Sequence, residues 1–328
     1  MNQQLGICTI SMGWHSLATL EEKIKAVQSS GISGLELNMI DLDKFAKRHS
    51  KCRLDAAKDA SILCKAAGIE VFALGPFEYF EGTPTPLSSR LDTAFEWMNV
   101  AHEFGCTVLQ VPINFSNNAV GDEKVIVDDL RALAELGLQQ KPPISIAYEA
   151  LAWGLHVADW EESLRVVDLV DCPNFGLCID TYHVLTRVWA DPRTVSGVRP
   201  GAASALRDTI QRFRTTCPPE KIIYIQLSDG EKMSPPILPG HPVYRADEDS
   251  TYSWCLYGRV FPLEAEEGAY FPLEGILRAW LIESGWKGWV SMETFHRDMD
   301  QRTITPGAWA ARAVKSWDRI TRLLSDKN

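Results

Sequence analysis

The chain has 328 residues, of which 45% are hydrophobic and 23% charged, an ordinary composition for a globular protein. Its net charge of −10 argues against a nucleic-acid-binding protein, which would normally carry a basic face. No apolar run approaches the ~18–20 residues of a membrane span, and the N-terminus lacks the basic start of a signal peptide. We therefore expect a cytoplasmic protein that acts on a small molecule, and the sequence leaves a homo-oligomer open.

Short apolar runs alternate with helical patterns along almost the whole chain. The runs that predict strands lie at 5–10, 34–38, 70–74, 107–113, 144–149, 175–180, 222–227 and 288–293. The stretches that predict helices lie at 19–29, 53–66, 89–104, 123–136, 160–170, 202–215, 272–284 and 306–324. Eight strand–helix units in register predict an α/β fold, a (β/α)8 TIM barrel in which residues 1–328 form one domain.

Two kinds of local signal add detail to this barrel. Glycines that follow helical stretches are typical of left-handed helix ends, and they lie at Gly68, Gly105, Gly137 and Gly285. Two loops are also unusual, because segment 76–88 is rich in Pro, Gly and aromatic residues and segment 228–271 is far longer than the ~2–6 residues typical of such loops. Long loops after barrel strands usually cover an active site, so we expect both to lie over it.

Oxygen-donor side chains occur at the ends of four consecutive predicted strands. They are Glu149, Asp180, Gln226 and Glu293. Since the carboxyl ends of barrel strands meet at one rim, we expect these side chains to converge there. Three carboxylates and an amide oxygen favour Mg²⁺ or Mn²⁺ over a thiolate-type zinc site. A cation would also remove the repulsion between the clustered carboxylates. Any one of these residues alone would be better explained as a helix cap or a solvated side chain.

A histidine follows closely after the second of these donors, in the run Asp180-Thr181-Tyr182-His183. This position would put an imidazole beside the predicted metal. A single histidine is usually structural, but this one is a candidate general base or acid. A base beside a metal-polarised carbonyl is what removal of a proton α to that carbonyl requires.

These segments together resemble the xylose-isomerase-like barrel superfamily, which includes sugar-phosphate isomerases and epimerases. The resemblance covers nearly the whole chain. Within the superfamily, the sequence is most similar to the 3-dehydroshikimate dehydratases of quinate catabolism and siderophore biosynthesis. Gln226 stands at a metal position where epimerases usually carry His, and the run 180–183 matches the dehydratase pattern. The segments that carry the likeness are 147–149, 178–183, 224–229, 259–262 and 288–293, with 76–77 and 80–82.

The resemblance implies a lyase that needs a divalent cation, Mn²⁺ or Mg²⁺, and no other cofactor. The cation would polarise a carbonyl of a cyclic hydroxy acid, His183 would remove a proton from the adjacent carbon with Glu149 also in a catalytic role, and loss of a hydroxyl would give protocatechuate. Arg259 is the candidate for the substrate carboxylate, and Glu36 and His156 are further candidate substrate contacts. Each has a plain alternative as a salt-bridged or polar loop residue.

The sequence departs from the dehydratase pattern in two substrate-facing loops. Glu78 and Tyr79 stand where an Arg is usual, and Leu263 and Glu264 follow the segment 259–262 where Gly-Glu or Gly-Gln is usual. Because Arg clamps carboxylates in a bidentate manner, its loss would weaken recognition of an acidic substrate. The sequence therefore supports the metal site more strongly than the substrate.

Three other functions use the same kind of barrel. A sugar or sugar-phosphate isomerase or epimerase usually needs a second base, and none is clear in the sequence. A DNA-repair endonuclease would carry several extra His ligands and a basic groove, neither of which the chain shows. A non-catalytic metal-binding barrel stays open on the sequence alone.

Overall fold

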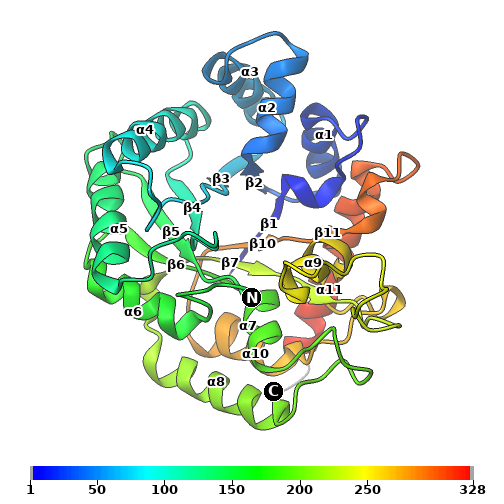
Figure 1. The fold of residues 1–328 in the computed structure, drawn as a ribbon. Helices are drawn as coiled ribbons and strands as arrows, with labels where there is room; N and C mark the ends of the chain where they lie inside the picture. The colour runs from blue at the N-terminus through cyan, green and yellow to red at the C-terminus, as the bar shows by residue number, and fades with distance from the viewer. Residues whose placement is uncertain (1–2, 326–328) are drawn as a thin grey trace.

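The computed structural model describes residues 3–325, in which eight parallel strands close into a barrel with helices around it (Figure 1). The strands run around the barrel in the order β1-β10-β7-β6-β5-β4-β3-β2. They are β1 (Gln4–Cys8), β2 (Gly34–Asn38), β3 (Glu70–Gly75), β4 (Val108–Pro112), β5 (Ser145–Glu149), β6 (Phe175–Asp180), β7 (Ile222–Leu227) and β10 (Trp289–Met292). The predicted (β/α)8 barrel is thus confirmed, with strand bounds within a few residues of those expected.

The outer helices follow the predicted stretches closely. They are α1 (Leu20–Ser30), α3 (Arg53–Ala66), α4 (Leu87–Phe104), α5 (Glu123–Leu138), α6 (Trp160–Val170), α8 (Ala202–Thr216), α10 (Leu273–Arg278) and α11 (Pro306–Ser325). The stretch predicted at 272–284 is not one regular helix, because α10 passes into a π-helical turn, η4 (Ala279–Glu283), in which the Ser284 N–H bonds the Ala279 carbonyl. Short 3₁₀ turns are η1 (Thr9–Met12), η2 (Pro219–Lys221), η3 (Ala265–Glu267) and η5 (Arg297–Asp300).

Three further helices were not predicted: α2 (Met39–Arg48), α7 (Thr181–Val188) and α9 (Ser250–Gly258). Each begins directly after a side chain that accepts a hydrogen bond from a backbone N–H of its first turn. These caps are Asn38 for Ile40, Asp180 for Tyr182 and Asp249 for Thr251. Since α2 and α7 start where β2 and β6 end, no loop in the sequence separates strand from helix.

The helix-end glycines agree with the prediction at three of four positions. Gly68, Gly105 and Gly285 have φ of 70°, 71° and 69°, the left-handed conformation that glycine adopts without strain. Gly137 is different because it lies inside α5. A Cβ there would stand 2.6 Å from the Ile144 carbonyl oxygen, so this glycine permits close packing of the helix on the chain that enters β5.

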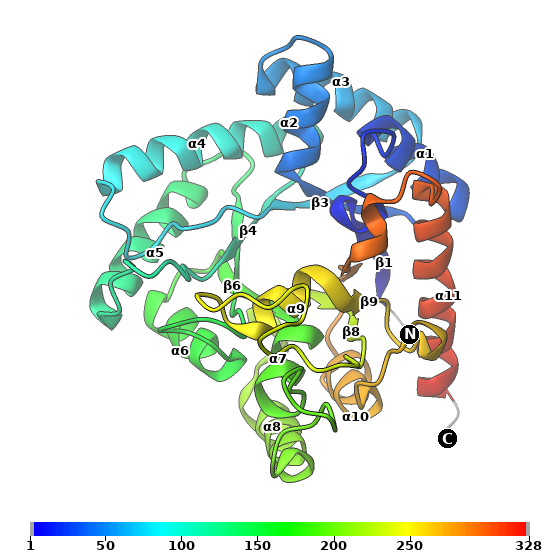
Figure 2. The same ribbon diagram turned by 45° about the vertical axis from the view of Figure 1, so that its right-hand side comes forward.

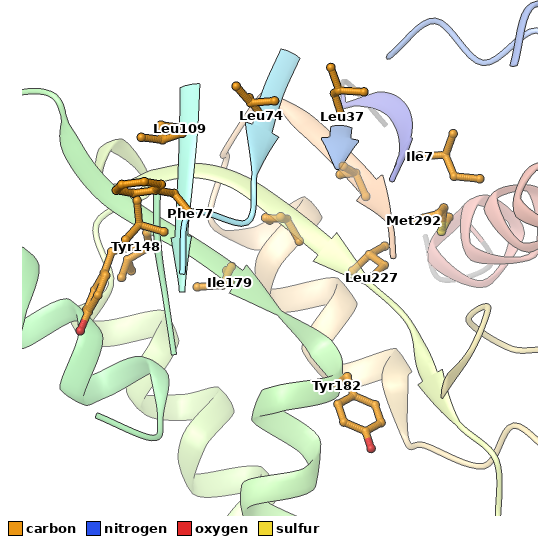
Figure 3. Packing of buried hydrophobic residues seen from close by; sticks show 14 of the residues in the cluster. Ile7, Leu37, Leu74, Phe77, Leu109, Tyr148, Ile179, Tyr182, Leu227 and Met292 are labelled. Carbon is orange, nitrogen blue, oxygen red and sulfur yellow. The ribbon is translucent and has the colours of Figure 1, made fainter. Parts of the chain in front are cut away.

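Hydrophobic packing forms two layers, one outside the barrel and one within it. Each barrel strand sends apolar side chains outward against the helices, and Figure 3 shows Ile7, Leu37, Leu74, Leu109, Tyr148, Ile179, Leu227 and Met292 in this layer. A smaller cluster fills the barrel interior, formed by Phe72, Ala73, Ala147, Cys178 and Tyr224. Side chains alternate along a strand, so residues two positions further on also face the barrel interior. They lie closer to the carboxyl ends of the strands, at the upper opening of the barrel.

The long segment after β7 is built rather than irregular. It contains β8 (Asp229–Gly230), α9 and β9 (Arg259–Val260), and β9 pairs antiparallel with both β8 and β11 (Phe295–His296). In Figure 2 this segment, drawn in yellow, lies in front of the barrel strands. Separately, no helix within residues 3–325 has the length and apolar character needed to cross a membrane.

Candidate active site and metal centre

The four predicted oxygen donors lie on four adjacent strands of the barrel. β5, β6, β7 and β10 are consecutive neighbours, and Asp180 and Gln226 face each other in the register of β6 and β7. Glu149 ends β5, and Glu293 directly follows β10, where its N–H still bonds the Leu227 carbonyl at 3.2 Å. The expectation that these strand ends share one side of the rim is therefore correct.

Glu149, Asp180 and His183 form a compact buried cluster on the β5–β6 side. One ligand atom from each lies within 4.8 Å of the others. His183 Nε2 is 3.6 Å from Glu149 Oε1 and 3.7 Å from Asp180 Oδ2. The other ring nitrogen, Nδ1, accepts a hydrogen bond from the Ala152 N–H at 3.1 Å. The first turn of α7, capped by Asp180 itself, thus fixes the imidazole with Nε2 toward the carboxylates.

Arg259 reaches this cluster from β9 and is fully enclosed, with 1% of its surface exposed. Its Nη2 forms an ion pair with Asp180 and a second with Glu293 Oε2 at 3.0 Å, and its Nε donates to Ser228 Oγ at 2.7 Å. The guanidinium also lies 5.2 Å from the Tyr182 ring centroid. The candidate for the substrate carboxylate is thus bound in this structure to two of the predicted metal ligands.

Gln226 lies between the two sides of the rim and contacts Glu36. Its Nε2 donates to Glu36 Oε1 at 2.8 Å, and the Tyr224 hydroxyl donates to the same oxygen at 2.7 Å. The Gln226 amide oxygen accepts from Cys178 Sγ at 3.2 Å. Glu36, on β2, is therefore joined to the predicted ligand set through Gln226 and lies inside the barrel with 3% of its surface exposed.

Burial shapes the protonation of every acid in this site. It raises the pKa of Glu149 well above the usual value, and the charges of Glu293 and Asp180 raise it further. Burial likewise raises the pKa of Asp180, against the opposing charge of Arg259, and raises that of Glu293 to about 8. Burial and the charge of Arg259 lower the pKa of His183 well below the usual range. These carboxyls can all be ionised together only if more positive charge is present.

The residues on the β5–β10 side fit a divalent cation. Glu149 Oε1 is buried and has no hydrogen-bond partner, which is an unfavourable state for a carboxylate oxygen without a ligand. Carboxylate and amide oxygens from Glu149, Asp180, Gln226 and Glu293 make a hard donor set on neighbouring strands. A cation would supply the positive charge that the clustered acids need.

A cavity of about 220 Å³ opens directly above this cluster. Glu149, His183, Arg259 and Glu293 form its polar floor, while Asn38 and Gln110 contribute amide groups from neighbouring strands. Both unusual loops cover it as expected, since segment 76–88 contributes Pro76 and Glu78, and segment 228–271 contributes Tyr252, Cys255, Leu256 and Arg259. Trp153 and Phe115 complete an aromatic wall.

Two candidate substrate contacts lie outside this lining. Glu36 is beneath the floor, bonded to Tyr224 and Gln226. His156 lies in the loop after β5, where its Nε2 is 3.2 Å from the Ala119 carbonyl oxygen and its ring packs against Gly121. The structure therefore brings Arg259 to the cavity and leaves Glu36 and His156 away from it.

Three further residues belong to the site and were not among the predicted ones. Gln110 on β4 donates to Glu149 Oε2, Tyr224 on β7 donates to Glu36, and Cys8 ends β1 beside Glu36. Gln110 and Tyr224 had a signal in the sequence, since each interrupts an apolar strand with a polar group that must find a partner inside the barrel. Cys8 had none, because a cysteine in an apolar run is typical of a core residue.

A closed parallel barrel with acids and a histidine at the carboxyl ends of its strands defines an α/β-barrel protein with its site at the rim. A family model described as the xylose isomerase-like TIM barrel matches residues 24–320. This chain belongs to that family.

Similar proteins include a 3-dehydroshikimate dehydratase of Neurospora crassa, 35% identical over 98% of this chain and 94% of the relative. Another 3-dehydroshikimate dehydratase, of Pseudomonas aeruginosa, is 29% identical over 89% of this chain, which spans only 38% of that protein's length. Among solved structures, a xylose isomerase-like TIM barrel/4-hydroxyphenylpyruvate dioxygenase fusion protein matches with a TM-score of 0.76 and 26% identity, over 99% of this chain and 43% of the fusion protein.

Proposed function

We propose that this chain is a 3-dehydroshikimate dehydratase, a hydro-lyase that converts its substrate to protocatechuate and water. The observation that carries the proposal is the likeness to the N. crassa dehydratase, which extends over 98% of this chain and 94% of that enzyme. The chemistry of the site agrees with it, because a buried histidine and clustered carboxylates line a cavity of about 220 Å³, which suits a small ring. We place this activity in one cytoplasmic domain over residues 1–328.

The floor of the cavity has the groups that the reaction needs. A divalent cation, Mn²⁺ or Mg²⁺, held by Glu149, Asp180, Gln226 and Glu293, would supply polarisation of the substrate carbonyl. The chain itself must position the ring, remove a proton from the carbon next to the carbonyl, and let a hydroxyl leave from the following carbon. Arg259 is the cationic side chain in the cavity lining and is assigned to the substrate carboxylate.

His183 and Glu149 are assigned to proton transfer. Because the Ala152 N–H donates to Nδ1, the neutral imidazole carries its proton on Nε2, the atom that faces the cavity floor. In this tautomer Nε2 has no free lone pair, so His183 can accept a proton from carbon only after the ring proton moves to Nδ1 and the hydrogen bond from the Ala152 N–H is released. The unpartnered Glu149 Oε1, 3.6 Å from Nε2, is the second proton acceptor at this place. The depressed pKa of His183 keeps the ring uncharged, so that it is not blocked as imidazolium near neutral pH.

A direct assay tests the proposal. Purified protein is incubated with 3-dehydroshikimate and Mn²⁺ or Mg²⁺, and formation of the aromatic product is followed by its near-ultraviolet absorbance. We expect turnover that stops on addition of a chelator and returns with the metal. The Glu293→Ala variant, assayed under the same conditions, should form no product. Absence of product with every divalent ion would refute the dehydratase, and normal turnover by Glu293→Ala would refute the ligand assignment.

A further inference from the structure

A second group of ligand atoms, formed by Cys8, Glu36 and Glu293, adjoins the first and extends to β1 and β2. We propose that these three residues, here called the thiol cluster, form a second cation site that selects a thiophilic divalent ion such as Zn²⁺. Glu293 would be shared with the site on the β5–β10 side. The proposal concerns binding at this cluster and stands whether or not the dehydratase assignment is correct.

The barrel holds the three ligands close together. β1 lies between β10 and β2, and Cys8 faces Glu36 in the register of β1 and β2. Ile7 pairs with Met292, so Cys8 and Glu293 are the next residues along β1 and β10. One ligand atom from each of the three residues lies within 4.8 Å of the others. Zinc bonds of about 2.0–2.3 Å place neighbouring ligands roughly 3.5–4 Å apart, so small side-chain shifts suffice to bind an ion.

Glu36 supplies an independent sign of a missing ligand. Its Oε1 is fixed by two donors, the Tyr224 hydroxyl at 2.7 Å and Gln226 Nε2 at 2.8 Å. Its Oε2 is buried and has no partner at hydrogen-bonding distance, and the side chain is only 3% exposed. The Ser291 hydroxyl, also without a partner, is near enough to lower the pKa of this carboxyl, but burial still raises that pKa above its usual value. Buried carboxylate oxygens are normally satisfied by a donor or a cation. An oriented, unpartnered oxygen beside a thiol therefore points to a cation.

Formal charge is compatible with a second ion. Glu36, Glu149, Asp180 and Glu293 bring four negative charges into the barrel, and Arg259 brings one positive charge. One divalent cation on the β5–β10 side leaves a single negative charge. A Cys8 thiolate adds one more, and a second divalent cation then makes the whole set neutral. The set is equally neutral with one cation, a protonated Cys8 and one protonated carboxyl, so the metal titration described below decides between the two states.

The donor atoms of the two sites select different ions. Three carboxylates and an amide favour Mg²⁺ or Mn²⁺, whereas a thiolate favours Zn²⁺ or Co²⁺. The thiol cluster should thus remain empty in Mg²⁺ and bind Zn²⁺ or Co²⁺ when these are offered. This difference makes the two sites separable by experiment.

Cobalt provides the direct probe, because a cysteine thiolate bound to Co²⁺ gives a sulfur-to-metal charge-transfer band in the near ultraviolet. Chelator-treated full-length protein is titrated with Co²⁺, and absorbance and bound metal are measured together. We expect about two Co²⁺ per chain and a charge-transfer band that Zn²⁺ removes. Cys8→Ser should bind one Co²⁺ fewer and lack the band.

Cys178→Ser is the matched control, since Cys178 is also inside the barrel and 2% exposed but does not belong to the thiol cluster. It should keep the band. Glu36→Gln gives a second variant that should weaken Co²⁺ binding and lose the band if Cys8→Ser does not fold. No band in the wild type, or a band that persists in Cys8→Ser or is unchanged in Glu36→Gln, would overturn the proposal. Because no substrate is present, these outcomes are independent of the turnover assay.

Discussion

The two sides of the barrel rim bury similar acids in different surroundings. On the β5–β6 side, Glu149 and His183 form part of the cavity floor, and Glu149 Oε1 has no hydrogen-bond partner. On the β1–β2 side, Glu36 lies below the floor, and Tyr224 and Gln226 hold one of its oxygens. Burial alone therefore does not decide whether an acid can take part in the reaction. Glu149 and His183 can contact a substrate in the cavity, whereas Glu36 can influence it only through Gln226 or a bound ion.

The largest expected difference between the sides is in turnover. Glu149→Gln keeps the shape of the side chain but removes a proposed ligand and proton acceptor, so we expect kcat to fall by at least ~10³-fold. Glu36→Gln keeps an oxygen for Tyr224 and Gln226, and we expect a loss of only ~10–100-fold. Steady-state assays at saturating metal compare the two. Equal losses would mean that both sides take part in the chemistry directly.

Removal of the imidazole should separate chemistry from metal binding. We expect His183→Gln to lower kcat by ~10²–10⁴-fold while the Kd for Mn²⁺ stays near the wild-type value, because His183 is not among the proposed ligands. Turnover and calorimetric Mn²⁺ binding are measured on the same preparations. His102→Gln is the control, since His102 lies near the end of α4, at the opposite end of the barrel. A near-normal rate in His183→Gln would remove His183 from the mechanism.

A smaller effect is expected at the entrance to the β5–β6 side. Glu78 lines the cavity with a side chain that is still exposed to solvent, and desolvation by the surrounding protein raises its pKa. Glu78 therefore becomes negatively charged at a higher pH than an ordinary glutamate. An anionic Glu78 repels the substrate carboxylate, and we expect Glu78→Gln to lower KM by ~2–5-fold at pH 8 and less at lower pH. The exposed Glu96→Gln on α4 is the control. A higher KM in Glu78→Gln would instead make Glu78 a substrate-binding residue.

The last expected effect is on stability behind β5, and it leaves turnover unchanged. Glu81 accepts hydrogen bonds from the Asn114 N–H and the Tyr148 hydroxyl, and burial raises its pKa from 4.5 to about 7. The folded chain therefore holds this proton more tightly than the unfolded chain. The resulting stability is fully present below about pH 4.5 and is lost as the pH rises through about 7.

The difference corresponds to on the order of 3 kcal/mol. We expect the free energy of unfolding by urea to fall less between pH 5 and pH 8 in Glu81→Gln than in the wild type. Asp229, whose pKa burial raises to about 7, should keep its own share of the slope in both proteins. An identical slope in both would mean that Glu81 is ionised in the folded protein at low pH.

The barrel and its rim were predictable from the sequence for physical reasons. Strands buried on both faces read as continuous apolar runs, and the carboxyl ends of parallel strands must meet, so the ends of β5, β6 and β10 were correctly expected on one side of the rim. Within that side, the ligand atoms of Glu149 and Asp180 group with His183, whereas that of Glu293 groups with Cys8 and Glu36. Helices α2 and α7 were missed because each starts at the residue after its strand, without a loop to mark the change. Gly137 was wrongly assigned to a helix end. A glycine is required there by close packing against Ile144 and not by the backbone conformation, and the sequence does not distinguish these two causes.

Contacts that depend on the return of a long loop were beyond reach. The sequence marked segment 228–271 only as a long loop, whereas the structure shows that it forms α9 and pairs β9 with β8 and β11. Only that path brings Arg259 onto Asp180 and Glu293. In the same way, Cys8 gave no sign of standing beside Glu36, because pairing of the first and second strands in a closed barrel sets that distance.

Arg259 also links the cover of the cavity to the charge of its floor. The arginine follows directly after α9, the helix that lies over the cavity, and its guanidinium is bound to Asp180 and Glu293. Lifting this segment would withdraw a positive charge from a barrel that already holds an excess of acids. A cation that took the place of the guanidinium beside these acids would therefore lower the electrostatic cost of lifting the segment.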